Sequence, residues 1–173
     1  MYRDPSLEPA LALAAPTVGM ALAAIPEGQW LDRKSVRIRP AHLAQTEVAF
    51  ANAEGGTILI GIHDGRVEGT DAHPQHRNEL MQTAIDQTEP AVRIRSTLVE
   101  CRNDRGQPDH LLVIDVAPSD TVHATARDEV FLRVGDENRR LSFAQRQELV
   151  YDKGHAHFDG TPVADVTAAD LDP

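Results

Sequence analysis

The sequence is poor in the residues that several common functional sites require. It contains a single cysteine, Cys101, which excludes an internal disulfide and a cysteine-built zinc site. Aromatic residues make up 4% of the chain, which disfavours recognition of single strands by base stacking. No apolar run approaches the about 20 residues of a membrane-spanning helix, and the acidic start lacks the basic segment of a secretory signal. We therefore expect a cytoplasmic protein that does not enter a membrane.

Positive charge is scarce relative to negative charge. The formal net charge is −10, whereas a protein that coats nucleic acid nonspecifically would normally carry a basic excess. The stretch from Asp152 onward holds five aspartates and one lysine and so contributes −4 of this total. A Gly-x-x-x-x-Gly-Lys phosphate loop is absent from the sequence, so nucleotide binding by such a loop is not supported.

The composition is otherwise that of a globular domain. Of the 173 residues, 41% are hydrophobic and 25% are charged, and the chain is long enough to bury a proper core. We expect an α+β fold, a single domain with a mixed or mainly antiparallel sheet flanked by helices. Residues 1–16 are expected to form a flexible N-terminal segment and residues 17–151 the domain. Residues 152–173 are interpreted as an acidic tail, or as a linker toward a further C-terminal domain in a longer protein.

Apolar periodicity and the positions of proline and glycine predict the order of helices and strands. Helices are expected at 17–24, 40–52, 78–87 and 142–151, and strands at 33–39, 57–62, 66–68, 92–100, 109–117 and 129–134. The segment 57–62 is continuously apolar, which is typical of a strand inside a sheet. The predicted core contains Phe50, Ile58, Leu59, Ile60, Leu80, Leu112, Val113 and Ile114.

The segment 50–65 carries the most information about a functional site. Asn52 and the Gly55-Gly56 pair are suited to end a helix and reverse the chain. The apolar strand follows, and His63-Asp64-Gly65 ends it. Asp64 therefore lies where a strand passes into a loop, a common position for a functional side chain on a rigid scaffold.

Arginine residues alternate with apolar residues over 33–39. As a strand, this segment would place Arg33, Ser35, Arg37 and Arg39 on one face. Arginine side chains suit phosphate, because their guanidinium forks match its oxygens. The alternative is a solvated strand face whose arginines pair with neighbouring carboxylates.

Three motifs in order make the chain resemble the Schlafen AlbA-like domain family of bacterial transcriptional regulators and animal Schlafen proteins. The first is the opening motif with Glu27, Asp32 and Lys34, in which Asp32 replaces the family's second glutamate. The second is Phe50-Ala-Asn-Ala-Glu-Gly-Gly with the following apolar strand and Asp-Gly turn. The third is Phe131-Leu-Arg-Val-Gly-Asp-Glu-Asn-Arg139. The resemblance covers roughly residues 17 to 150.

In the nuclease-active members of this family, these positions form a metal-dependent RNA-cleaving site. The resemblance implies that Glu27, Asp32 and Asp64 are ligands of Mg²⁺ or Mn²⁺ and that Lys34 contacts phosphate. Asp32 is one methylene shorter than glutamate, which weakens the expected metal site. The alternative is structural: Glu27 is an exposed loop residue, Asp32 pairs with Arg33 or Arg37, and Asp64 shapes an Asx turn with Gly65.

Three functions remain open from the sequence. The preferred one is a nucleic-acid-binding regulatory domain for DNA or RNA that contacts phosphates through Arg33, Lys34, Arg37, Arg133, Arg139 and Arg140. The second is a metal-dependent endoribonuclease built on Glu27, Asp32, Asp64 and Lys34. The third is a protein-interaction or assembly module, with a homo-oligomer formed through exposed strand edges.

Overall fold

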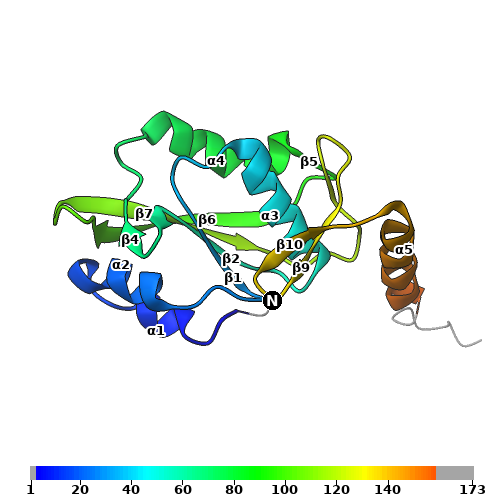
Figure 1. Ribbon diagram of the computed structural model, residues 1–173, viewed down its shortest axis with the longest axis horizontal. Helices are drawn as coiled ribbons and strands as arrows, with labels where there is room; N and C mark the ends of the chain where they lie inside the picture. Colours follow the sequence, from blue (N-terminus) through cyan, green and yellow to red (C-terminus); the bar gives the residue numbers. More distant parts are fainter. Residues whose placement is uncertain (1–2, 159–173) are drawn as a thin grey trace, which may run out of the picture.

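A four-stranded sheet forms the middle layer of the molecule, with helices on both of its faces (Figure 1). The computed structural model describes residues 3–158. The strand order is β1 (Leu31–Lys34), β2 (Gly56–Ile60), β7 (Pro108–Val116) and β6 (Ile94–Arg102). β1 is parallel to β2, whereas β7 is antiparallel to both β2 and β6. The sheet is therefore mixed and the fold is α+β, as predicted.

Each face of the sheet is covered by a pair of helices because the strand side chains alternate between two cores. α1 (Leu7–Leu11) and α2 (Ala15–Ala24) pack on the face that carries Leu59 and Val113. α3 (Pro40–Asn52) and α4 (Pro74–Asp86) pack on the face that carries Ile58 and Ile114. All eight predicted core residues are buried. Within the segment that we expected to be flexible, Leu7 is fully buried, so α1 belongs to the packed structure.

The crossover from β1 through α3 to β2 brings distant parts of the chain together. Pro40 opens α3, and after the helix Gly55 adopts a φ of +78° that turns the chain into β2. Near the helix end, the Asn52 side-chain amide donates to the carbonyls of His123 and Phe131, both at 2.9 Å. The backbone N–H of His123 donates back to the Asn52 side chain at 2.8 Å. Asn52 therefore joins the end of α3 to two later segments of the chain, at His123 and at Phe131.

The predicted strand at 33–39 is wrong in its bounds. β1 ends at Lys34, and the following residues form a turn, because the Glu68 carboxylate accepts hydrogen bonds from the Ser35 hydroxyl at 2.8 Å and the Val36 N–H at 3.2 Å. The arginines at 33, 37 and 39 therefore do not share one strand face. The strand at 57–62 is interior as predicted, but it breaks at Gly61, where φ is +101°.

Short hairpins and a final helix complete the fold. The remaining strands are β3 (Ile62–His63), β4 (Arg66–Val67), β5 (Thr88–Glu89), β8 (Ala124–Thr125), β9 (Phe131–Val134) and β10 (Glu137–Arg140), followed by α5 (Phe143–Phe158). α4 begins four residues earlier than predicted, at Pro74. α5 extends past the predicted end at residue 151 into the expected tail, and the rest of that tail lies outside the described residues. Between residues 3 and 158 we find no helix with the length and apolar character needed to span a bilayer.

Candidate functional site

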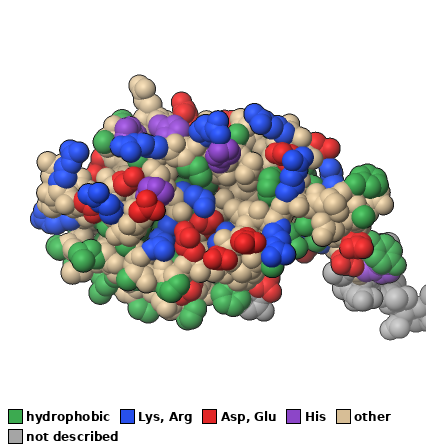
Figure 2. All heavy atoms as spheres, viewed as in Figure 1, with side chains coloured by type: hydrophobic (Ala, Val, Ile, Leu, Met, Phe, Trp, Pro, Cys, Tyr) green, Lys and Arg blue, Asp and Glu red, His purple; other side chains and the backbone are tan. Residues whose placement is uncertain are grey.

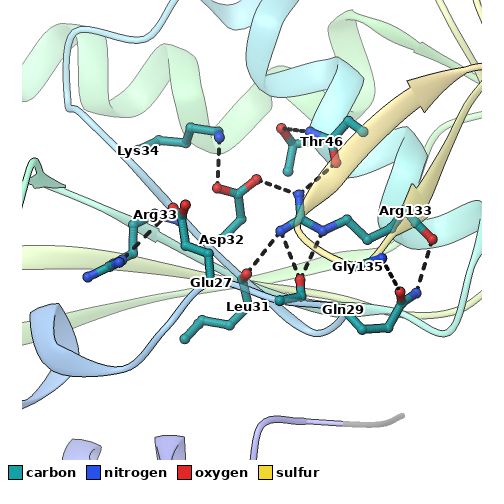
Figure 3. A network of polar contacts seen from close by, with 11 residues as sticks. Glu27, Gln29, Leu31, Asp32, Arg33, Lys34, Thr46, Arg133 and Gly135 are labelled. Carbon is teal, nitrogen blue, oxygen red and sulfur yellow. Dashed lines mark hydrogen bonds and ion pairs between the residues drawn. The ribbon is translucent and has the colours of Figure 1, made fainter.

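A buried ion pair between Asp32 and Arg133 lies beside the edge strand β1 (Figure 3). Arg133 Nη1 donates to Asp32 Oδ2 at 2.9 Å, and both residues are only 2% exposed. The other carboxylate oxygen, Oδ1, accepts a hydrogen bond from Lys34 Nζ at 2.7 Å. The negative charge of Asp32 is therefore shared between two cations that come from different parts of the chain.

The guanidinium of Arg133 is fully used within the protein. Besides Asp32, it donates to the Asn138 side chain, twice to the Gly28 carbonyl and once to the Leu31 carbonyl, at 2.9 to 3.1 Å. These contacts match the five N–H donors of an arginine. The guanidinium also lies 4.9 Å from the ring centre of Phe50. The prediction of a phosphate contact at Arg133 is therefore corrected, because this side chain joins β9 to β1.

The two faces of β1 carry different polar groups. Asp32 lies opposite Ile58, whose side chain packs under α3, and Arg33 lies opposite Leu59, whose side chain packs against α1 and α2. Lys34 follows Asp32 by two residues and therefore shares its face. Arg33 Nη1 donates to the Ala23 carbonyl at the end of α2. Asp32 pairs with Lys34 and Arg133, and not with Arg33 or Arg37 as the structural alternative held.

Glu27 covers the free edge of the sheet. Its carboxylate Oε1 accepts the backbone N–H of Arg33 at 2.9 Å and lies 3.9 Å from the Arg33 Nε. The outward N–H groups of an edge strand otherwise remain open to pairing with another chain. Glu27 therefore has a structural role in this arrangement, and it also lines a cavity together with Arg33.

Asp64 lies in a two-residue turn that connects β3 to β4. His63 and Arg66 lie opposite each other in the antiparallel β3–β4 pair, so Asp64 and Gly65 form the loop between the strands. Their φ values are +48° and +73°. Two consecutive positive φ values define a type I′ hairpin turn, and Asp-Gly is a preferred sequence for it. The Asp64 side chain is 82% exposed, and the His63 Nε2 lies 3.3 Å from its Oδ2. Asp64 and Gly65 therefore form a backbone turn between the two strands, and the Asp64 carboxylate is accessible.

A cavity of about 450 Å³ brings several of the predicted site residues together. It is lined by Glu27, Arg33, Lys34, Ser35, Ile38, Ile62, His63, Asp64 and Gly65. A second cavity of about 690 Å³ adjoins it, because His63 and Asp64 line both. Arg37, Arg66 and Arg105 are the arginines that line the second cavity. Sequence reasoning did not select His63 and Arg66, although both flank the Asp-Gly turn that it identified.

The predicted carboxylate set does not form a metal site in this structure. Glu27 and Asp64 line the first cavity, whereas Asp32 is paired with Lys34 and Arg133 and is absent from the cavity lining. Within residues 3–158, no group of three or more histidine, cysteine, aspartate or glutamate side chains is placed to hold one metal ion. A divalent ion would need Asp32 to exchange a cation partner for the metal, so the residues as arranged do not fit it.

Of the other predicted phosphate contacts, Arg37, Arg139 and Arg140 are exposed, whereas Arg33 and Lys34 are half-buried. Arg37 is exposed in the turn that follows β1. Arg139 and Arg140 project from β10, where each forms a surface ion pair at 3.2 Å, with Glu137 and Glu129 respectively. Such exposed pairs contribute little to stability, so these arginines are available to other anions. A chain of contacts runs from Lys34, which lines the first cavity, through the Asp32–Arg133 pair to Asn138 in β10.

Comparison with known proteins identifies a family. The family model described as Schlafen, AlbA_2 matches residues 27–142, which confirms the resemblance inferred from the three motifs. Among solved structures, the crystal structure of the DIP2311 protein from Corynebacterium diphtheriae is similar, with a TM-score of 0.49 and 24% sequence identity. The match covers 73% of this chain and 29% of that one, so the chain spans less than a third of that protein's length. No curated protein matches the chain.

Proposed function

The chain belongs to the Schlafen AlbA_2 family, and on that premise we propose that it is a nucleic-acid-binding regulatory domain that contacts phosphates at the end of β1 and along β10. One observation carries this proposal. The cavity at the end of β1 is lined by the cations Arg33 and Lys34 and by His63, beside the carboxylates of Glu27 and Asp64, and each of the two cations keeps N–H groups beyond those bonded within the protein. Phosphate oxygens accept hydrogen bonds from such groups.

The acidic net charge does not oppose local binding. Several acidic side chains near the cavities already have internal partners: Asp32 is paired with two cations, and Asp104 accepts hydrogen bonds from the Arg66 side chain and the Val67 N–H. By contrast, Arg37 is exposed and lines the cavity beside the Asp-Gly turn. Phosphate contacts depend on the local field of such groups, and the distant acidic residues are screened beyond about 8 Å at physiological ionic strength.

A triple variant tests the binding surface. Replacement of Arg37, Arg139 and Arg140 by alanine is expected to weaken binding of labelled RNA and duplex DNA by at least about tenfold at low salt. The salt slope should fall by about one unit for each phosphate that the variant no longer neutralises. Binding is measured by fluorescence anisotropy over a salt series. The substitutions spare the buried network around Arg133, so circular dichroism should show an unchanged fold.

The matched control removes the same charge elsewhere. Arg93, Arg95 and Arg127 are exposed, and the first two lie at or beside β6, the sheet edge opposite β1. Their joint replacement by alanine should leave affinity and salt slope within about twofold of the starting protein, beyond the general effect of net charge. Equal reductions in affinity in both triple variants, or no reduction in the first, would contradict the proposed surface.

A metal-dependent endoribonuclease is the second candidate. It is supported by Glu27, Lys34 and Asp64 lining one cavity, and it requires Asp32 to exchange one of its two cation partners for the metal. If it holds, RNA cleavage should require Mg²⁺ or Mn²⁺ and should be lost in Asp64→Ala, while RNA affinity persists through the arginines. Asp64 is exposed in its turn, so this substitution spares the core. Incubation of labelled tRNA with and without Mn²⁺ measures both properties. Cleavage that survives Asp64→Ala would reject this candidate.

A further inference from the structure

A small cavity of about 100 Å³ lies between the first turns of α3 and the segment 125–129. Its charged lining residues are Arg39, Arg127 and Glu129, and we call it the arginine pocket. Cavities that hold nucleotides and molecules of similar size measure about 300 to 1,000 Å³. The arginine pocket is therefore suited to one small group, such as a single carboxylate, and not to a whole small-molecule ligand.

The two arginines of this pocket keep unused donors. Both side chains are exposed. Arg39 Nη2 lies 2.8 Å from the His42 Nε2, and neither Arg39 nor Arg127 forms an ion pair with a carboxylate in the described part of the chain. The charge of Glu129 is offset by Arg140, whose Nη1 lies 3.2 Å from the Glu129 Oε1. The pocket is therefore a local excess of positive charge on a chain whose net charge is −10.

The helix α5 lies at one end of the molecule and is fastened close to this pocket (Figure 1). Arg146 Nη1 forms an ion pair at 2.8 Å with the Oδ1 of Asp128, which belongs to the segment 125–129. Further along the helix, Lys153 Nζ donates to the Ser119 carbonyl. Figure 2 shows Lys and Arg side chains on the part of this face that leads from α4 toward α5. The chain that follows α5 therefore starts from a fixed place near a basic surface.

Residues 159–173 have the charge and the length to reach the arginine pocket. They contain four aspartates and no lysine or arginine. Asp170 and Asp172 are separated by one residue, so two carboxylates lie close together in the chain. From the end of α5 at Phe158 to Asp170, the extended chain spans about 40 Å. A return along the helix to the level of Arg146 needs about 18 Å.

We propose that the arginine pocket binds the carboxylates of Asp170 and Asp172, so that the acidic tail docks across the segment 125–129 onto the start of α3. Arginine forks match carboxylate oxygens and form charge-assisted hydrogen bonds with them. A tethered group meets its site at an effective concentration in the millimolar range, which favours the tail over a free anion. The tail is then part of the surface of the domain and not a free linker.

A nitroxide spin label on Ala169→Cys tests the contact in the full 173-residue chain. The native Cys101 is buried and does not take up the label. The label is expected to broaden the backbone amide signals of Ala41 and Ala126, which line the pocket, and not the signal of Gly106 in the β6–β7 turn. The broadening should disappear as salt approaches 1 M, where the Debye length falls to about 3 Å.

Substitution of the arginines tests which side chains hold the tail. Arg39→Ala/Arg127→Ala should reduce the broadening at least about fivefold, because the tail loses its counter-charges. Both residues are exposed, so circular dichroism should show an unchanged fold. Arg95→Ala/Arg105→Ala removes two exposed arginines elsewhere, is the matched control, and should leave the broadening unchanged.

A charge reversal separates a direct contact from a general effect of net charge. Asp170→Arg/Asp172→Arg should abolish the broadening, and its combination with Arg39→Glu/Arg127→Glu should restore it. Failure of the combined variant to restore the broadening would overturn the proposal, as would the absence of broadening in the chain with native charges.

Neutral variants of the tail complete the test. Asp170→Asn/Asp172→Asn should lose the broadening, whereas Glu100→Gln/Asp136→Asn, which neutralises two exposed carboxylates elsewhere, should keep it. Broadening that persists without the two tail carboxylates would overturn the proposal. If inorganic phosphate at millimolar concentration shifts the pocket amides while the label never broadens them, the pocket belongs to free anions and the proposal is likewise wrong.

Discussion

Replacement of Glu47 by leucine is expected to stabilise the folded chain by about 3 kcal/mol at pH 7. Glu47 lies in the middle of α3 and is fully buried. Both of its carboxylate oxygens lack a hydrogen-bond partner among the described residues. Burial raises the pKa of this carboxyl from 4.5 to about 8. Leucine has a similar volume and leaves no polar atom without a partner, so it removes the cost of burying the carboxyl group.

The same pKa predicts how stability changes with pH. The folded protein keeps the Glu47 proton up to about pH 8, whereas the unfolded chain releases it near pH 4.5. Between these values the folded state binds more protons, so the free energy of unfolding falls as pH rises. This contribution is fully retained below the unfolded value and is lost as pH rises through the folded value. Glu47→Leu should therefore flatten the profile between about pH 5 and 8.

Urea unfolding at pH 5, 7 and 8.5 measures this effect. Glu47→Gln is a useful intermediate, since it removes the titration but keeps polar atoms in the core, and it should flatten the pH profile with a smaller gain in stability. Glu148→Gln on the exposed side of α5 is the matched control and should change neither quantity. A pH profile that is the same in Glu47→Leu and the starting protein would show that Glu47 is not the buried titrating group.

The predictable parts of the fold are the elements whose ends are marked by proline, asparagine or glycine in the adjoining sequence. Pro40 and Asn52 mark the two ends of α3. The short apolar run after Gly56 is typical of a strand that is buried on both faces, and it forms β2. The strand prediction at 33–39 failed because alternation alone does not distinguish a strand from a turn. Here the turn is set by Glu68, which is distant in the sequence and whose carboxylate accepts a hydrogen bond from the Val36 N–H.

In the candidate site too, some features could be predicted from local sequence and others depend on residues that are distant in the sequence. The motif residues Glu27, Lys34 and Asp64 line one cavity, whereas Asp32, which the resemblance implied as a further metal ligand, does not line it. The burial of Arg133 could not be predicted, because it depends on β9 packing across α3 toward β1, and strand placement is not readable from one sequence. Glu47 had a readable signal. It lies four residues after Leu43 and three before Phe50, on the buried side of a helix.

Removal of the Arg133 guanidinium is expected to have the largest destabilising effect. Arg133→Ala leaves the buried Asp32 carboxylate with Lys34 as its remaining cation and leaves the Gly28 and Leu31 carbonyls without their guanidinium donors. Breaking one partner of a buried ion pair costs about 3 to 5 kcal/mol. We expect a decrease of this size in the free energy of unfolding by urea. Arg133→Lys should not restore it, because a lysine cannot reproduce the five-donor geometry.

Controls separate the network from general charge loss. Arg139→Ala removes an arginine from the neighbouring strand β10, where its side chain is exposed and forms only a surface ion pair. It should change the free energy of unfolding by less than about 0.5 kcal/mol. A double variant, Asp32→Leu/Arg133→Leu, removes both charges and should be more stable than Arg133→Ala, because no uncompensated buried charge remains. Additive effects of the two substitutions would contradict the coupled pair.

This coupling decides how loss of function at Asp32 must be interpreted. Asp32→Asn keeps the shape of the side chain but leaves Arg133 buried without its counter-ion, so it should lower stability together with any binding or cleavage. If the chain cleaves RNA, Asp64→Ala should lower cleavage without lowering stability, because Asp64 lies in an exposed turn. Thermal unfolding and nucleic-acid binding measured on the same samples distinguish the two cases. If Asp32→Asn unfolds at the same temperature as the starting protein and still loses cleavage, Asp32 acts in the chemistry and the structural assignment of the Asp32–Arg133 pair is wrong.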